Sequence, residues 1–326
     1  MSQLLPIVSV IIAAPPHLAE VQAVVAARKL DYPADRLDII VARGEHPSVQ
    51  RNVALRAARG EWIYFLDDDA LPPPDNLRRA ENFLQNPAVA MVGGPNICPP
   101  GAPLLEQVFA VVLASWLAFG PSRARYTPVG EMRDSCEKEL ILCNTLARRE
   151  ALLELGGFNE ALYPNEENAL MDELQKRGLR LVYDPEFIVH RCPRRTLKAF
   201  LKMLRTYGRG RAEQFRLHPT PGSVLNFVPP LFCLYLAAFT VVNCFSLPGL
   251  LRLLVAAPLM IYFVAVIGQT LASIRDAGLV RSLLALPLLV ASHIFYGLGF
   301  WHGQFTKLNT SGNQVRTEVV LETITR

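Results

Sequence analysis

Three consecutive carboxylates, Asp67, Asp68 and Asp69, follow the apolar run Trp62-Ile63-Tyr64-Phe65-Leu66. The run is short, partly aromatic and partly β-branched, which predicts a buried strand. Like charges this close repel and raise one another's pKa, so the three acids need a compensating charge. Mg²⁺ or Mn²⁺ together with a phosphate-bearing ligand would supply it, because carboxylates are hard ligands. The alternative is a solvated acidic turn that precedes the next helix.

The elements that would position these acids alternate between strand and helix. We expect strands at 7–13, 37–42, 62–66, 89–92, 140–146 and 179–183, and helices at 18–30, 48–59, 75–84, 149–155, 166–177 and 194–216. The first half of this order predicts an α/β fold, a doubly wound sheet with helices on both faces. In such sheets ligands bind beyond the carboxyl ends of the strands, where the three aspartates lie.

Composition divides the 326 residues into a charge-rich part, 1–218, an apolar part, 226–301, and a polar tail, 302–326. The charge-rich part ends in a basic helix that would lie at a membrane interface or, alternatively, form an ordinary surface helix. The mean hydropathy of +0.23 is unusual for a soluble protein. The apolar part predicts about three transmembrane helices, at 226–245, 251–272 and 280–301, each near the ~20 residues that a crossing needs. Buried core helices are the alternative. Three crossings would place the tail across the membrane from the charge-rich domain.

Basic residues predict the orientation of these helices. The N-terminal run 7–14 has no basic residue before it, so we expect no signal peptide and a cytoplasmic catalytic domain. Arg275 and Arg281 would then lie on the cytoplasmic side, as the positive-inside tendency requires. The sequence thus predicts a multi-pass protein of the inner (plasma) membrane, with membrane lipids as partners. The apolar segment 104–119 contains Glu106 and is expected to form an interfacial or core helix.

Charge and cysteines exclude other classes. The net charge is +4, and no basic patch with interleaved aromatics or zinc-type spacing occurs, so no nucleic-acid partner is expected. The six cysteines form no C-x-x-C pair and are interpreted as structural and reduced.

Ordered motifs carry a resemblance to a known family. The chain resembles the family 2 glycosyltransferases, and its C-terminal part looks like the membrane-anchored bacterial branch that builds exopolysaccharides. The matching segments are Val8-Ser9-Val10-Ile11-Ile12, Gln50-Arg51-Asn52, Ala57-Ala58-Arg59-Gly60-Glu61, Phe65 to Asp69, Val92-Gly93-Gly94-Pro95, Leu155 to Glu160, Asn165-Glu166-Glu167-Asn168, Tyr207 to Ala212 and His293 to Gly303.

The resemblance implies a GT-A fold, of the nucleotide-diphospho-sugar transferase type, and inverting transfer of a sugar from a nucleotide-diphospho-sugar. In this family Asp67 would contact the nucleotide and Asp69 the metal, with Asp68 as a neighbour at the donor site. A metal would act as a Lewis acid on the departing diphosphate. The general base is the second acid of an acidic pair, which here is Glu167, a glutamate in place of the usual aspartate. Glu166 is the alternative, and both acids also suit a helix N-terminus.

Four further residues are candidates by the same resemblance. Arg51, in the Gln50-Arg51-Asn52 motif, is a donor-binding candidate. Arg209 and Arg211 would bind a donor or lipid phosphate, since guanidinium groups bind phosphate bidentately, or they form a juxtamembrane basic patch. His190 is either a further metal ligand or a structural histidine.

Departures from the family pattern leave two functions open. Pro15-Pro16-His17 and Arg43-Gly44-Glu45 stand where the family usually binds the nucleobase, and the Gln-x-x-Arg-Trp of processive synthases is missing. The first reading is an enzyme that adds one sugar to a lipid-linked or polysaccharide acceptor. The second is a catalytically impaired scaffold in a polysaccharide assembly complex. A nucleotidyltransferase is disfavoured because no Gly-rich loop follows the first strand.

Overall fold

The computed structural model describes residues 5–162, 165–217, 219, 221–245, 248–307 and 318–324. The chain divides into two compact units. The first comprises Met1–Pro99, Pro121–Cys192 and Asn309–Arg326, and the second comprises Pro100–Gly120 and Pro193–Leu308. The chain therefore leaves the first unit twice and returns to it twice.

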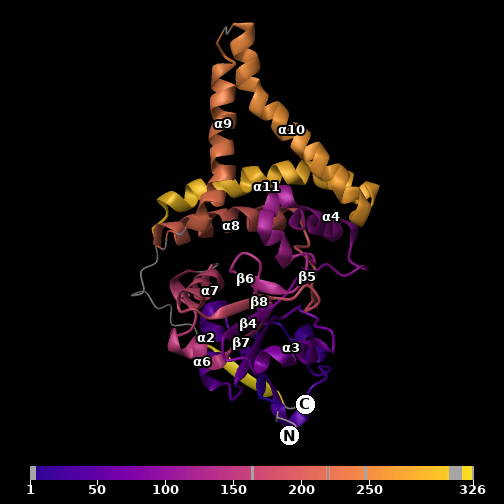
Figure 1. The fold of residues 1–326 in the computed structure, drawn as a ribbon, viewed down its shortest axis with the longest axis vertical. Coiled ribbons are helices and arrows are strands. Elements are labelled where there is room, and N and C mark those ends of the chain that lie inside the picture. The colour runs from indigo at the N-terminus through magenta and orange to yellow at the C-terminus, as the bar shows by residue number, and fades with distance from the viewer. Residues whose placement is uncertain are drawn as a thin grey trace. The chain divides into compact units, whose positions relative to one another are not determined.

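A mixed β-sheet forms the centre of the first unit (Figure 1). Its described strands, in spatial order, are β10 (Val320–Ile324), β2 (Leu37–Arg43), β1 (Val8–Ala14), β3 (Trp62–Asp67), β7 (Asn144–Arg148), β4 (Val89–Gly93), β8 (Arg180–Tyr183) and β6 (Arg133–Ser135). β1 pairs in parallel with both β2 and β3, whereas β7 is antiparallel to β3 and β4. A separate short pair joins β5 (Asn96–Ile97) to β9 (Val189–His190).

Helices cover both faces of this sheet, because alternate side chains of each buried strand point to opposite faces. In β3, Trp62, Tyr64 and Leu66 pack into one core, and Ile63 and Phe65 into the other. The first core also contains residues of α1 (Gln22–Ala27) and α3 (Asn76–Leu84). The second contains residues of α2 (Pro47–Ala57), α6 (Arg149–Glu154) and α7 (Glu166–Lys176). The α/β fold with helices on both faces, expected from the sequence, is confirmed.

The end of the chain differs from the sequence interpretation. Residues 302–326 were expected to form a polar tail on the far side of the membrane. Instead α11 continues to Phe305, and Val320–Ile324 form the edge strand β10, antiparallel to β2. The run Val319-Val320-Leu321-Glu322-Thr323-Ile324 is rich in β-branched residues, which suits an edge strand. A tail hydrogen-bonded to β2 lies on the same side of a membrane as β2, so that expectation is corrected.

The described part of the second unit is helical. Its helices are α4 (Leu104–Leu113), α5 (Trp116–Phe119), α8 (Leu197–Leu217), α9 (Val228–Val242), α10 (Gly249–Ala277) and α11 (Leu279–Phe305). The single helix expected at 104–119 is broken, because Ser115 caps α5 by accepting a hydrogen bond from the Ala118 N–H at 3.3 Å. Among the described residues, three helices are long and apolar enough to cross a membrane: Val224–Val242, Gly249–Ala277 and Leu279–Phe305.

Candidate active site

The three aspartates begin at the carboxyl end of β3 and continue into a tight turn. The Ala70 N–H donates to the Asp67 carbonyl at 3.1 Å, and the Asp68 carbonyl accepts from the Ala23 N–H at 3.0 Å. Leu71 and His190 then exchange backbone hydrogen bonds of 2.9 and 3.0 Å. This exchange fixes β9, and the residues after it, beside the acidic turn.

Arg51 connects the acidic turn to the glutamate pair. It comes from α2, is almost fully buried, and donates from Nη2 to Asp67 Oδ1 and from Nη1 to Glu166 Oε1, each at 3.1 Å. Asp67 and Glu166 are far apart in the sequence, and one guanidinium group holds both carboxylates. Glu166 is the first residue of α7, so Arg51 ties the start of that helix to the end of β3.

Arg191 is the functional candidate that the sequence interpretation missed. It follows β9 and forms ion pairs with the other oxygen of Asp67, at 2.8 Å, and with Asp69 Oδ1, at 2.5 Å. Asp67 is therefore clamped between two arginines. The local signal was weak, because Arg191 lies in the basic run Arg191-Cys192-Pro193-Arg194-Arg195, which resembles an ordinary surface segment.

These contacts form a continuous charge chain, Glu166–Arg51–Asp67–Arg191–Asp69, which we call the site ion-pair chain. With Asp68 and Glu167 beside it, five carboxyl groups face two guanidinium groups. A formal surplus of three negative charges remains when all of them are ionised. Such a surplus favours a divalent cation or a cationic group of a ligand.

Burial and like charge perturb two of these acids. Burial, followed by the charges of Asp69 and Asp67, raises the pKa of Asp68, and Arg191 opposes the rise. Burial, followed by the charge of Glu167, raises the pKa of Glu166 to about 7, and Arg51 opposes the rise. Glu166 Oε2 is buried and has no hydrogen-bond partner among the residues that the structure describes.

The two glutamates occupy different surroundings at the start of α7. Glu166 is buried, with its side chain 2% exposed, whereas Glu167 is only partly buried. Buried asparagines support the turn: Asn168 donates to Asn165 Oδ1 at 2.9 Å, and Arg125 donates to Asn168 Oδ1 at 2.5 Å. Of the pair, Glu167 is therefore the one that solvent or an acceptor can reach.

Two of the sequence motifs meet through Asn52. Its side chain accepts from the Phe158 N–H and donates to the Phe158 carbonyl, both at 2.8 Å, and also donates to Glu160 Oε1 at 2.8 Å. Gly157 has a φ of +84°, and a Cβ there would lie 2.4 Å from Asn52 Oδ1. The Arg51-Asn52 pair thus holds the Gly157-to-Glu160 segment with one side chain and α7 with the other.

The remaining candidates are placed less directly. His190 lies in β9, and its Nδ1 is buried without a hydrogen-bond partner in the described part of the chain. Arg209 and Arg211 lie on α8 in the second unit, where Arg209 pairs with Glu213 at 3.5 Å and Arg211 with Gln214 at 3.1 Å. These two arginines therefore have partners on their own helix.

The donor set suits a hard cation held in part by a ligand. Within the described ranges, no cluster of three or more His, Cys, Asp or Glu side chains is arranged to hold a metal. Asp69 is 44% exposed, and the structure gives an ion pair to Oδ1, one of its two oxygens. Mg²⁺ is commonly bound by one or two carboxylates with waters and substrate phosphates completing its shell. Asp69 and its neighbours fit that mode of binding.

The segment Arg43-Gly44-Glu45, which departs from the family pattern, is hydrogen-bonded to other parts of the chain through Arg43. Arg43, at the end of β2, donates to Glu322 of β10 at 2.6 Å and to the Leu18 carbonyl at 2.6 Å. The Gln50 side-chain amide donates hydrogen bonds to the carbonyls of Ala14 and Ala42, at 2.8 and 2.5 Å.

The six cysteines, all in the described ranges, are free thiols.

Two named bacterial proteins are similar to this chain in sequence. The chain is 28% identical over 196 residues to the pre-mycofactocin glycosyltransferase of Mycobacterium tuberculosis, covering 58% of this chain and 40% of that protein. This chain therefore matches less than half the length of the mycobacterial protein. It is 23% identical over 260 residues to the succinoglycan biosynthesis protein ExoA of Rhizobium meliloti, covering 79% and 74%.

A solved structure shows the same fold. The mannosyltransferase PcManGT from Pyrobaculum calidifontis, in complex with GDP-Man and Mn²⁺, gives a TM-score of 0.51 at 20% identity, covering 88% of this chain and 87% of that one. The family model described as glycosyl transferase family group 2 matches residues 62–292, more than half of the chain. The match begins at β3, which carries Asp67, and includes Arg191. The chain thus belongs to glycosyl transferase family group 2, and it has a GT-A-like fold.

Proposed function

We propose that this protein is a glycosyltransferase that moves one sugar, with inversion and with the help of a divalent metal, from a nucleotide-diphospho-sugar to a lipid-linked or polysaccharide acceptor. The observation that carries the proposal is the site ion-pair chain. It joins the acidic turn after β3 to Glu166, at the start of α7, through Arg51 and Arg191.

The donor half of the site is assigned to Asp67, Asp68 and Asp69. A diphosphate leaving group develops negative charge, and bound Mg²⁺ or Mn²⁺ would offset that charge as a Lewis acid. Asp69 is the proposed ligand because it is the more exposed of the two clamped aspartates, 44% against 23%. Arg51 and Arg191 hold Asp67 in a fixed geometry from both of its oxygens.

The acceptor half is assigned to Glu167. Inverting transfer needs a base that takes the proton of the acceptor hydroxyl as the bond to the sugar forms. Glu167 is partly exposed at the N-terminus of α7, whereas the neighbouring Glu166 is buried against Arg51. Glu167 would take the proton of the acceptor hydroxyl, and Glu166 would be a positioning residue for Glu167.

The acceptor is proposed to come from the membrane. In the part of the chain that the structure describes, three helices are long and apolar enough to cross a bilayer. One curated relative is a succinoglycan biosynthesis protein, which supports a polysaccharide-type acceptor. We place the first unit at the cytoplasmic face of the inner membrane, where a nucleotide-sugar would reach it.

Nucleotide binding tests the donor site. Detergent-purified protein would be titrated with a panel of nucleoside diphosphates in the presence and absence of Mn²⁺, using wild type, Asp69→Ala and the exposed control Asp35→Ala. We expect one nucleotide to bind with Mn²⁺, its affinity to fall at least ~10-fold in Asp69→Ala, and Asp35→Ala to match wild type. Failure of every nucleotide to bind would favour the scaffold alternative and point to Arg43 and its partners as the reason.

Glu167→Gln separates the base from donor binding. Loss of a general base lowers the rate by about 10²–10⁴-fold. We expect that loss in sugar transfer with nucleotide affinity unchanged. The control is Glu173→Gln on the exposed side of the same helix, where the pair with Lys176 contributes little. Transfer at the wild-type rate in Glu167→Gln would remove Glu167 from the mechanism.

A further inference from the structure

After α11, the last of the three long apolar helices in the described residues, the chain returns to the first unit. β10 follows α11 and pairs with β2 over Val320–Ile324, opposite Ile39 to Arg43. An ion pair of 2.6 Å between Arg43 and Glu322 anchors the same edge. Strands joined by a hydrogen-bond ladder lie in one compartment. The segment between the end of α8 and the start of β10 therefore crosses a membrane an even number of times.

The same reasoning applies to the first excursion of the chain. The helical segments Leu104–Leu113 and Trp116–Arg125, which contain α4 and α5, are bent by 59° relative to one another and are together long and apolar enough for one broken span. However, β5 precedes this pair and β6 follows it, and both strands belong to the first unit. A single crossing by α4 and α5 is excluded by that connectivity.

With an even number of crossings, at most two of the three long apolar helices in the described residues cross the membrane. The extent to which protein buries each helix indicates which one does not cross. In the most apolar 18-residue stretch of each helix, protein buries 6% of the stretch that includes α9 and 6% of the stretch in α10. The corresponding share in α11 is 39%. Bare apolar helices suit surrounding lipid, since lipid tails satisfy apolar side chains that no protein covers. α11 instead has much of its surface covered by protein.

α8 covers α11 by backbone contact through glycines. A Cβ on Gly299 would lie 2.0 Å from the Arg205 carbonyl oxygen, and one on Gly303 would lie 2.4 Å from that of Arg209. From the other side, a Cβ on Gly208 would lie 2.0 Å from the Tyr296 carbonyl oxygen. The contacts advance along both helices together, so α8 and α11 run side by side in the same direction, as Figure 1 shows.

α8 cannot cross a membrane, so a helix held along it does not cross either. Its 21 residues include six basic side chains, and each charge at a bilayer centre costs at least about 2.5–3.5 kcal/mol. These are Lys198, Lys202, Arg205, Arg209, Arg211 and Arg216. An amphipathic basic helix lies in the interface plane, with its charges toward the headgroups.

α9 and α10 have the properties of a spanning hairpin. Figure 1 shows them reaching the α8–α11 layer at separate points and converging toward their far end. The connection at 243–248, Asn-Cys-Phe-Ser-Leu-Pro, has no charge, whereas Arg275 and Arg281 flank the connection between α10 and α11. This asymmetry agrees with the positive-inside tendency if the far end of the hairpin lies outside and the basic connection lies with α8.

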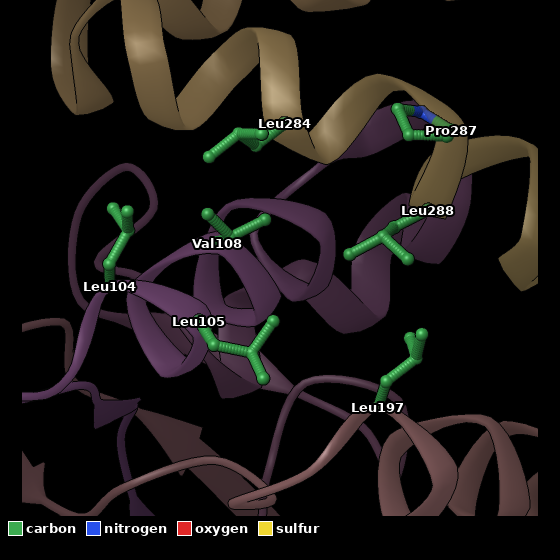
Figure 2. A pocket seen from close by; sticks show the side chains of 7 residues that line it. All are labelled: Leu104, Leu105, Val108, Leu197, Leu284, Pro287 and Leu288. Carbon is green, nitrogen blue, oxygen red and sulfur yellow. The ribbon is translucent and has the colours of Figure 1, made fainter.

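We infer that the chain crosses the membrane twice, through α9 and α10, and that α11 lies with α8 in the membrane interface on the side of the first unit. The inference rests on the proposed membrane association. An apolar hollow of about 270 Å³ between α4, α8 and α11 fits it (Figure 2). Leu104, Leu105, Leu197 and Leu284 line that hollow and are each more than 40% exposed, as expected of side chains that meet acyl chains.

Side-specific labelling tests this topology. Each variant would carry one cysteine, with the other native cysteines replaced by alanine, and would be treated with a membrane-impermeant maleimide in oriented membrane vesicles of both orientations. The reporters are Asp35→Cys for the first unit, Leu279→Cys and Phe305→Cys for the two ends of α11, and native Cys244 for the tip of the hairpin, all at exposed positions. A compartment-sensitive reporter fused after residue 326 of the otherwise native chain gives an independent reading.

We expect Asp35→Cys, Leu279→Cys, Phe305→Cys and the C-terminal reporter to respond from one side, and Cys244 from the other. Labelling of the two ends of α11 from opposite sides would show that α11 crosses. Labelling of Cys244 from the side of Asp35→Cys would show that the hairpin does not cross. Recovery of the protein in the soluble fraction without detergent would instead refute the membrane association itself, while leaving the nucleotide-binding test of the function in place.

Discussion

The two units hold distant segments together by opposite means. In the first unit, Arg51 and Arg191 bind carboxylates supplied by two separate stretches of chain, so charge complementarity fixes the site. In the second unit, the backbones of α8 and α11 come into contact at three glycines, Gly208, Gly299 and Gly303. The contacts in the first unit depend on the charges of the side chains. The contacts in the second unit depend on the absence of a side chain at each glycine, which lets the two backbones approach closely.

This difference predicts which substitutions destabilise each unit. Removing one partner of a buried ion pair strongly destabilises the folded protein, because the other charge is left unpaired in a poorly solvated place. A glycine contact is insensitive to charge and salt but fails when even one methyl group is added. The same substitution at a contact position and at an exposed position therefore distinguishes the two kinds of contact.

Arg51→Gln should give the largest effect. It removes the partner of buried Glu166 and one of the two clamps on Asp67, so we expect a loss of about 3–5 kcal/mol in the free energy of unfolding. Chemical denaturation of the detergent-purified protein, followed by tryptophan fluorescence, would measure it. The control is Arg59→Gln: Arg59 is 59% exposed and lies 3.6 Å from Asp38, so less than about 1 kcal/mol is expected. Equal losses in the two variants would mean that Arg51 acts only as a surface charge.

Gly299→Ala tests the second unit. The new methyl group would lie 2.0 Å from the Arg205 carbonyl oxygen, so α8 and α11 must separate, and we expect a loss of about 1–3 kcal/mol. The matched control is Gly268→Ala in α10, where a Cβ meets nothing within 4 Å. That control should be neutral or stabilising by up to about 1 kcal/mol, since alanine is the better helix former. A loss of stability in Gly268→Ala as large as in Gly299→Ala would show that the backbone contact is not what matters.

Local patterns allowed the sheet to be predicted from the sequence. The apolar runs at 7–13, 37–42, 62–66 and 89–92 correspond to β1, β2, β3 and β4, because each strand is buried on both faces and reads as a continuous run. The predicted strand at 140–146 begins only at Asn144, since the preceding residues form a turn. The predicted helix at 18–30 is shorter, at Gln22–Ala27, because Pro15-Pro16 and the loop after them are not helical.

Partners could not be predicted from local patterns. Asp67, Asp69 and Glu166 were identified as candidates by residue type and motif, but the role of Arg191 depends on a pairing between β9 and the turn after β3 that leaves no local trace. The same holds for α11, which is as long and apolar as a spanning helix. Its glycines were visible in the sequence, but their partner on α8 was not.

The smallest expected effect is a change in the pH dependence of stability. Burial and the charge of Glu167 raise the pKa of Glu166 to about 7, from an ordinary value near 4.5. Between these two values the unfolded chain has released the proton while the folded chain retains it. Stability contributed by this group is therefore complete below about pH 4.5 and is lost as the pH rises toward 7.

Glu166→Gln should remove that loss, because glutamine mimics the protonated carboxyl and does not titrate. We expect the free energy of unfolding to fall less between pH 5 and pH 7 than in wild type, by on the order of 1–2 kcal/mol. Denaturation at a series of pH values would measure it. Glu173→Gln, on the exposed side of α7, should keep the wild-type slope. An unchanged slope in Glu166→Gln would mean that Glu166 is already ionised in the folded protein at pH 5, and that the pair with Arg51 outweighs burial.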